Sequence, residues 1–334
     1  MRCFWDERQR AHAPVGEFFN GAIHPAAEHP GRVDAILQAI GRTQAPTDHG
    51  MEPLRRVHSG PYLQLLQSAY GEWRAIGRAG DAFPYTFPVV GRRTLKLSRI
   101  DARLGQHSFD TATPIGAGTW DAAYWSAQTA LSALDAVLED GEAAFALCRP
   151  PGHHAGADYL GGYSYLSNGA IAAEEALARG VKRIAVLDVD YHHGNGTQDI
   201  FYRRGDVLFA SIHADPATDY PFFWGHAEEC GEAEGEGTTL NLPLPRGTQW
   251  SGYAPALAQA LDWIEKHAPD LLIVSYGADT HEDDPISLFK LKTADYAPMG
   301  RRIASLGLPT LIVMEGGYAV DALGANVAAF LSGF

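Results

Sequence analysis

The chain has little cysteine, with three residues, Cys3, Cys148 and Cys230, spread over 334 positions. Their odd number and wide spacing provide neither a disulfide framework nor the paired cysteines of a zinc finger, which favours a reducing, cytoplasmic environment. The N-terminal sequence MRCFWDERQR contains no long apolar segment, so we expect no secretory signal. No apolar run approaches the about 18 consecutive residues of a membrane-spanning helix, so we expect no membrane partner.

Lysine and arginine are also scarce, since 26 of them stand against 40 aspartates and glutamates, for a formal net charge of −14. Such an acidic surface argues against nucleic acid as the main partner and is compatible with cationic ligands. Apolar residues make up 46% of the chain and charged residues 20%, which is the composition of a globular protein. The length allows one large α/β domain or two ordinary ones.

From Ala143 onward, apolar runs alternate with helical patterns. Strands are expected at residues 143–148, 184–187, 207–212, 271–276 and 310–314, and helices at 168–179, 251–267 and 293–306. This alternation predicts an α/β fold, with a mostly parallel sheet covered by helices on both faces.

The first 140 residues are less regular. Helices are expected at 61–73 and 119–138, but residues from about 75 to 118 show no clear periodicity. A connection of that length is uncommon inside a compact domain and often has a function. We therefore expect a single domain over residues 1–334, with a long inserted loop at about 75–118.

The segment at residues 187–196 reads LDVDYHHGNG and carries the most chemistry. Side chains at positions 188, 190 and 192 share one face of an extended backbone, because strand side chains alternate. On that face Asp190 and His192 can bind one divalent cation, and such donors suit zinc, iron, cobalt or manganese. The segment predicts a metal site at a strand end, where ligands of α/β proteins usually bind.

Three other expected strands end in similar chemistry. They are followed by His153 and His154 in RPPGHHAG, by Asp279 in SYGADTHEDDP, and by Glu315 to Tyr318 in MEGGY. Each motif alone has an ordinary explanation, such as a capping carboxylate or a glycine turn. If the strands are parallel, however, all four loops lie at one edge of the sheet, which favours a metal-dependent enzyme.

Together these motifs resemble the histone deacetylase and acetylpolyamine amidohydrolase superfamily, strongly over about residues 119–334 and more loosely before them. The resemblance implies an arginase/deacetylase-like fold and hydrolysis of acetylated amines. It implies one catalytic zinc ion per subunit, bound by Asp190, His192 and Asp279. An arginase-like ureohydrolase needs a two-metal set of histidine and aspartate motifs that this sequence lacks.

The resemblance also implies catalytic roles. His154 is expected to be the general base and then the general acid, with His153 as its electrostatic partner, and Tyr318 is expected to donate to the developing oxyanion. Many lysine deacetylases have an acid where this chain has Asn195. An amide there should leave His154 less basic, and it resembles the acetylpolyamine branch of the superfamily.

A structural potassium ion is implied as well. Asp188 is expected to support His153 and to help bind that ion. The remaining potassium-binding residues implied by the resemblance are Asp190, His192, Ser211 and Ile212.

For the substrate, the resemblance implies a tunnel flanked by the aromatic rings of Tyr163 and Tyr220. Glu17 and Asp101 correspond to acids that attract a distant ammonium group in the polyamine-acting branch, whereas a further acid of that branch corresponds to Ala112. The insertion is expected to narrow the mouth and to form a homodimer contact. Residues 281–284, HEDD, either line the rim or form only a charged loop.

The sequence thus predicts a zinc-dependent hydrolase of acetylated polyamines. Alternatives left open are a broader small-molecule or xenobiotic amidase, an acetyl-lysine protein deacetylase, and a non-catalytic metal-dependent sensor. The sensor is disfavoured because Tyr318 and both tandem histidines are present.

Overall fold

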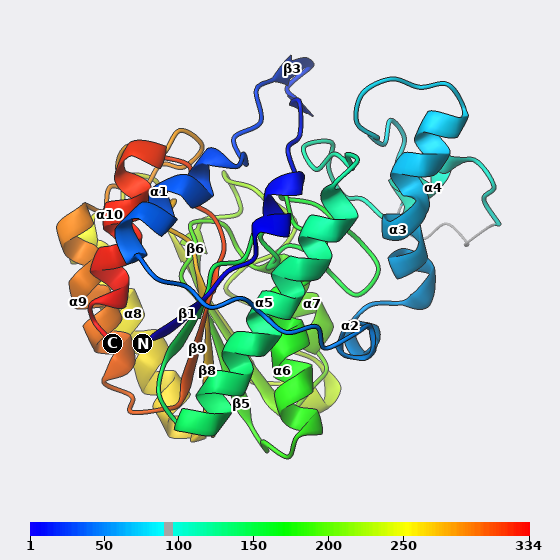
Figure 1. The fold of residues 1–334 in the computed structure, drawn as a ribbon. Coiled ribbons are helices and arrows are strands. Elements are labelled where there is room, and N and C mark those ends of the chain that lie inside the picture. The colour runs from blue at the N-terminus through cyan, green and yellow to red at the C-terminus, as the bar shows by residue number, and fades with distance from the viewer. Residues whose placement is uncertain (90–95) are drawn as a thin grey trace.

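A parallel sheet forms the centre of the computed structural model, which describes residues 1–89 and 96–334 (Figure 1). Within these residues it has seven strands, in the order β1 (Arg2–Phe4), β4 (Ala144–Ala146), β9 (Thr310–Met314), β8 (Leu271–Tyr276), β5 (Ile184–Asp188), β6 (Val207–Ala214) and β7 (Thr239–Leu244). Every neighbouring pair is parallel. The prediction of an α/β fold with a mostly parallel sheet is confirmed.

Helices cover both faces of this sheet. On β5, Ile184 and Val186 face one apolar core, whereas Ala185 and Leu187 face the other. The first core is completed by α3 (Gly60–Ala75), α5 (Thr119–Asp140) and α6 (Asn168–Ala178). The second is completed by α1 (Gly31–Ile40), α8 (Trp250–His267), α9 (Thr293–Ala304) and α10 (Val320–Leu331). Burial on both faces explains why the strands are nearly continuous apolar runs.

The elements expected from apolar periodicity are present, with ends moved by a few residues. Gly180 follows α6 with a φ of +100°, in the left-handed region that a glycine adopts after a helix. The sequence patterns did not identify the short edge strand β1, strand β7 or helices α1 and α10. They also missed α2 (Glu52–Val57), α4 (Ile100–Gln106), α7 (Asn195–Phe201) and the hairpin of β2 (Glu17–Phe19) and β3 (Ala22–His24).

The four strands that end in the chemical motifs are consecutive neighbours, in the order β4, β9, β8 and β5. Because they are parallel, their carboxyl ends meet at one edge of the sheet. The β2–β3 hairpin rises from the body of the molecule, and α3 and α4 lie to one side of it (Figure 1).

The expected insertion at about 75–118 contains α4, and its residues 90–95 lie outside the described residues. Its two ends are joined by a pair of backbone hydrogen bonds between Ala82 and Ile115, of 2.9 and 3.0 Å. Among the described helices, none combines the length and apolarity needed to cross a bilayer.

A buried ion cluster connects the N-terminal segment to the carboxyl edge of the sheet. The carboxylate of Glu28 accepts from Arg32 Nη1 at 2.9 Å and from Arg149 Nε and Nη2 at 2.8 and 3.0 Å. Arg32 also donates to the carbonyl oxygens of Glu315 and Gly317, at 2.6 and 2.7 Å. Burial raises the pKa of Glu28, but the charges of Arg149 and Arg32 more than offset this and hold it below its ordinary value. The cluster therefore ties the loops after β4 and β9 to one carboxylate.

Replacing Glu28 with Ala should destabilise the protein by about 3–5 kcal/mol, because it leaves two buried guanidinium groups without their carboxylate. Urea unfolding followed by circular dichroism measures this change. The control is Glu7→Ala, which removes an acid that is 70% exposed and pairs with Arg10, and should cost at most about 1 kcal/mol. Equal costs for the two variants would contradict a stabilising role for the cluster.

Candidate active site

Asp190, His192 and Asp279 converge at the carboxyl ends of β5 and β8. Each offers one ligand atom, and these atoms all lie within 4.8 Å of one another. His192 Nδ1 lies 3.0 Å from Asp279 Oδ2 and 3.3 Å from Asp190 Oδ1. The structure thus brings together the three residues that the sequence nominated as metal ligands.

The surroundings of this triad fit a bound cation. A Cβ atom at Gly277 would lie 2.0 Å from Asp190 Oδ2, and one at Gly316 would lie 2.5 Å from Asp279 Oδ2. Both glycines therefore leave space that any other residue would fill beside the carboxylates. Burial and the charge of Asp190 together raise the pKa of Asp279 to about 8, and a divalent cation would relieve this repulsion between the two carboxylates. Two carboxylate oxygens and one imidazole nitrogen are a donor set that zinc accepts.

The tandem histidines lie beside the triad. The carboxylate of Glu315 accepts from the backbone N–H groups of Gly152 and His153, at 2.7 and 3.1 Å, and so fixes the loop that carries them. The two imidazole rings are 4.0 Å apart. Both side chains are almost fully buried, so their charges are set by their neighbours.

Those neighbours differ for the two rings. His153 Nδ1 lies 2.9 Å from Asp188 Oδ2, whereas His154 Nδ1 lies 2.6 Å from the amide oxygen of Asn195. Burial opposes a charge on His153, but Asp188 and Asp190 raise its pKa to about 10. Burial lowers the pKa of His154 well below its ordinary value, and the charge of His153 lowers it further. The pair therefore consists of a cationic His153 and a neutral His154.

Tyr318 is held over the same space by the loop after β9. The backbone N–H of Gly316 donates to Asp190 Oδ2 at 2.8 Å, and that of Tyr318 donates to Asp284 Oδ2 at 2.7 Å. The Arg32 guanidinium lies 4.7 Å from the centre of the Tyr318 ring. Burial raises the pKa of Tyr318 well above its ordinary value, so its hydroxyl remains a donor. Of residues 281–284, Asp284 is thus a buried support for Tyr318, whereas Asp283 is exposed.

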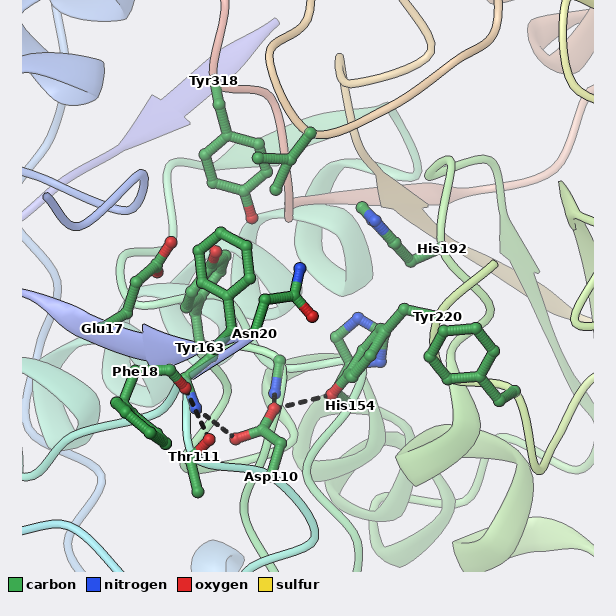
Figure 2. A pocket seen from close by; sticks show the side chains of 15 residues that line it. Glu17, Phe18, Asn20, Asp110, Thr111, His154, Tyr163, His192, Tyr220 and Tyr318 are labelled. Carbon is green, nitrogen blue, oxygen red and sulfur yellow. Dashed lines mark hydrogen bonds between the residues drawn. The ribbon is translucent and has the colours of Figure 1, made fainter. Parts of the chain in front are cut away.

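His154, His192 and Tyr318 line one cavity of about 370 Å³ (Figure 2). It is lined by Glu17, Phe18, Phe19, Asn20, Asp110, Thr111, Ala112, His154, Gly162, Tyr163, His192, Tyr220, Phe222, Ile286 and Tyr318. Four of these residues lie on or next to β2, so the hairpin closes one side of the mouth.

Tyr163 and Tyr220, which the sequence analysis assigned to a substrate tunnel, both line this cavity. The Tyr163 ring lies 5.6 Å from that of Tyr318, and the Tyr220 ring lies 5.2 Å from that of His154. The hydroxyl of Tyr220 donates to Asp110 Oδ2 at 2.9 Å, a bond drawn in Figure 2. An extended alkyl chain packs well against two such rings.

Glu17 reaches the cavity, and its side chain is buried. Its Oε2 has no hydrogen-bond partner among the described residues. Burial raises the pKa of Glu17 to about 6, although a hydrogen bond from Tyr163 opposes the shift. This carboxyl is therefore available to a cationic group.

Asp101 does not reach the cavity of its own chain. Its carboxylate accepts from Arg78 and Arg99, at 2.9 and 2.5 Å, so its charge is already compensated. The expectation that it contacts substrate therefore finds no support in this chain. Ala112 does line the cavity, and the acid nearest to it in sequence there is Asp110, which sequence patterns did not identify. Asp110 is an acid within a segment without periodicity, and nothing else in the sequence pointed to a role in the cavity.

The residues expected to bind potassium come from the neighbouring strands β5 and β6 and from the loop that follows β5. Strands β5 and β6 pair Asp188 with Ser211, and Ser211 and Ile212 are buried. Ser211 Oγ lies 2.9 Å from His213 Nδ1. The loop with Asp190 and His192 follows directly, and its Tyr191 carbonyl accepts from Ala214 at 2.8 Å.

Comparisons with known proteins agree with this geometry. Residues 24–334 match the model of the histone deacetylase domain. The chain is 50% identical to acetylpolyamine amidohydrolase 1 and 48% identical to acetylpolyamine amidohydrolase 2 of Pseudomonas aeruginosa, and the matches cover all of this chain and 99% and 98% of those proteins. The crystal structure of an acetylpolyamine aminohydrolase from Burkholderia pseudomallei superposes with a TM-score of 0.95 at 40% identity, covering all of this chain and 98% of the other.

Replacing Asp279 with Ala should weaken metal binding more than about 100-fold. Removing a residue that only hydrogen-bonds a metal ligand already lowers the affinity by up to about 100-fold, and removing a ligand itself should cost more. Competition with a chromophoric chelator measures the affinity without any assay of activity. The matched control is Asp283→Ala, an exposed acid four positions away, which should bind metal normally. Unchanged affinity in the Asp279 variant would show that the ligand set is wrong.

Proposed function

The chain belongs to the histone deacetylase domain family, and from this membership we propose that it hydrolyses acetylated polyamines to acetate and the free amine. The observation that carries the proposal is the convergence of three kinds of group at the base of one cavity. These are a buried metal-ligand triad, a neutral histidine, and a tyrosine hydroxyl. Relatives that match this chain over its full length are named for the same reaction.

A zinc ion bound by Asp190, His192 and Asp279 would polarise the amide carbonyl and acidify a water molecule. His154 is neutral and therefore able to accept the proton of the attacking water, and then to deliver it to the leaving amine. His153 is kept protonated by Asp188, and its positive charge stabilises negative charge that develops nearby during the reaction. The hydroxyl of Tyr318 donates a hydrogen bond to the carbonyl oxygen as it becomes an oxyanion.

The shape and charge of the cavity favour a small cationic substrate. Tyr163 and Tyr220 flank the path of an alkyl chain, while Glu17 provides a carboxylate for a distant ammonium group. The hairpin residues Phe18 to Asn20 narrow the mouth, which disfavours a folded protein as substrate. The net charge of −14 attracts polycations to the surface.

A broader small-molecule amidase is the second candidate, favoured by one observation. Three positions were expected to hold acids that select a charged substrate. Of these, Asp101 is paired with two arginines, and the position of the further acid of the polyamine-acting branch holds Ala112. Asp110 also lines the cavity, but its carboxylate already accepts from the Tyr220 hydroxyl and the backbone N–H of Gly162, so Glu17 carries most of the selection against an uncharged amide.

We also propose a structural potassium ion near Asp188, Ser211 and Ile212. Its support is the pairing of β5 with β6, which places Asp188 beside Ser211. Thermal unfolding in potassium, compared with the same concentration of a large organic cation, tests it. A melting temperature that does not depend on potassium would count against the ion.

A homodimer is proposed from the apolar side chains exposed on the hairpin and the insertion. These are Phe18, Phe19 and Ile23 of the hairpin, and Tyr85, Phe87, Val89 and Leu97 of the insertion. Sedimentation equilibrium distinguishes a dimer from a monomer. The free cysteines, of which Cys148 is buried, support a cytoplasmic location, which cell fractionation can check.

Activity should depend on a charged substrate in a way that follows Glu17. We expect kcat/KM for a monoacetylated diamine to exceed that for an uncharged acetamide of equal length by roughly tenfold or more, and an acetyl-lysine peptide to be poorer still. Because the pKa of the Glu17 carboxyl is about 6, this preference should be small below that pH and should grow above it. The substrate ammonium stays charged throughout this range.

Glu17→Gln is the matched variant for this measurement. It should lose the preference and its pH dependence while retaining hydrolysis of the uncharged amide. Equal rates for charged and uncharged amides in the unmodified enzyme would instead establish the broader amidase.

Replacing Tyr318 with Phe should lower kcat by about 10²–10³, since it removes one donor to the oxyanion. Metal content should not change, because Tyr318 is not one of the three residues that offer ligand atoms to the metal. Steady-state kinetics with metal analysis checks both statements, and normal turnover would remove Tyr318 from the mechanism.

A further inference from the structure

The partner of His154 leaves its tautomer open. An ionised carboxylate can accept hydrogen bonds but cannot donate them. It therefore fixes the proton on the imidazole nitrogen that faces it. The side chain of Asn195 has an oxygen and an NH₂ group, and a rotation by half a turn exchanges them. A general base needs Nδ1 protonated and Nε2 free, so something beyond Asn195 must select the orientation of this amide.

The next two groups in the hydrogen-bond chain make that selection. The amide nitrogen of Asn195 lies 3.3 Å from the hydroxyl oxygen of Tyr159. Tyr159 donates its single proton to Asp199 Oδ2 at 2.6 Å, much shorter than the 3.4 Å to the backbone carbonyl of Asn195. With its proton committed to Asp199, Tyr159 is left to accept from Asn195, whose oxygen must then face His154.

The far end of the chain is also fixed. Trp224 Nε1 donates to Asp199 Oδ1 at 3.2 Å, so both carboxylate oxygens are accepting. Burial and the charge of Asp199 raise the pKa of Tyr159 well above its ordinary value, which keeps the hydroxyl proton in place. The carbonyl oxygen of His154 adds a weak preference in the same direction, since it lies 3.5 Å from the Asn195 nitrogen.

We infer that Asp199 and Tyr159, acting through Asn195, are positioning residues that hold His154 in the tautomer with Nδ1 protonated and Nε2 free. They thereby do the work of a carboxylate placed next to the histidine. This inference rests on the proposed function for its catalytic consequence, but the tautomer itself does not depend on any activity.

Local structure keeps these groups in line. Asn195 and Asp199 stand four positions apart on α7, so they share one face of the helix. The ring of Tyr159 packs against Phe109 and Trp224, with centres 5.6 and 6.2 Å away. Gly156 leaves the space for it, because a Cβ atom there would lie 2.3 Å from the ring.

Two substitutions should disturb the chain differently. Tyr159→Phe removes the hydroxyl and frees the amide of Asn195 to rotate. Asp199→Asn should reverse the chain, because Trp224 still requires an oxygen and the new NH₂ group must then point at Tyr159. The Tyr159 hydroxyl would accept from that NH₂ group and donate to Asn195, whose nitrogen would turn toward His154.

The first measurement is the tautomer. Long-range ¹H–¹⁵N spectra of ¹⁵N-histidine-labelled protein report which ring nitrogen carries the proton, and His154→Gln assigns the signal. We expect Nδ1–H in the unmodified protein, a mixture in Tyr159→Phe and mainly Nε2–H in Asp199→Asn. Tyr124→Phe is the matched control, since Tyr124 donates to Asp48 in a comparable pair that has no link to His154.

The second measurement is kinetic, on the metal-loaded enzyme. Each variant should lower kcat by roughly 10-fold, the lower end of what outer partners of a site contribute, with KM unchanged. Placing Tyr159→Phe in an Asn195→Asp background should then cost almost nothing, because a carboxylate needs no relay to orient it.

The outcomes separate the possible failures. An unmodified protein that hydrolyses no acetylated amine would overturn the proposed function, while the spectra would still test the relay. Unaltered spectra in both variants would overturn the relay. So would an equal kcat loss for Tyr159→Phe with and without the Asn195→Asp substitution, since that would indicate a purely structural effect.

Discussion

Two carboxylates buried side by side, those of Asp190 and Asp279, set the main constraint on this structure. Neither can keep a negative charge in the interior without compensation. The protein supplies part of it through hydrogen bonds from the backbone of Gly316 to Asp190 and of Tyr191 to Asp279. His192 adds a third contact. The backbone N–H groups around the pair must therefore point at the carboxylates, which requires small residues there. A divalent cation completes the compensation of the negative charge.

The same constraint explains why backbone hydrogen bonds to buried carboxylates position the loops that carry the catalytic groups. Gly316 must approach Asp190 closely, which places the loop after β9 over the triad and Tyr318 at the cavity. The side chain of Glu315 then reaches the loop after β4 and holds it at Gly152 and His153. Geometry at the metal is in this way transmitted to the acid–base histidines through short polar bridges between neighbouring strand ends.

Much of this arrangement could be predicted from the sequence. The strands at 184–188, 271–276 and 310–314 are apolar runs buried on both faces, and each is followed at once by its reactive side chains. A parallel sheet then brings those side chains together whatever the connecting helices do. Apolar periodicity needs length, however, and β1 has three residues, so nothing marked it as a strand.

The cavity walls could not be predicted in the same way. Asp101 and Asp110 both lie in an aperiodic stretch, and only the folded path of the chain decides that one pairs with arginines while the other meets Tyr220. Two further partners of Arg32 are equally invisible in sequence, because they are backbone carbonyls. Hydrogen bonds to the main chain leave no pattern of residue types.

Those bonds of Arg32 also bear on how the chain acquires its site during synthesis. They join positions separated by 283 and 285 residues, and β1 likewise enters the sheet beside the distant strand β4, with Arg2 opposite Ala144. Contacts between positions so far apart in sequence have a large entropic cost of loop closure, and they form late in folding. The loop with Tyr318 is also synthesised long after the segment with Arg32. The complete site can therefore form only after the segment with Arg32 and the loop with Tyr318 have met.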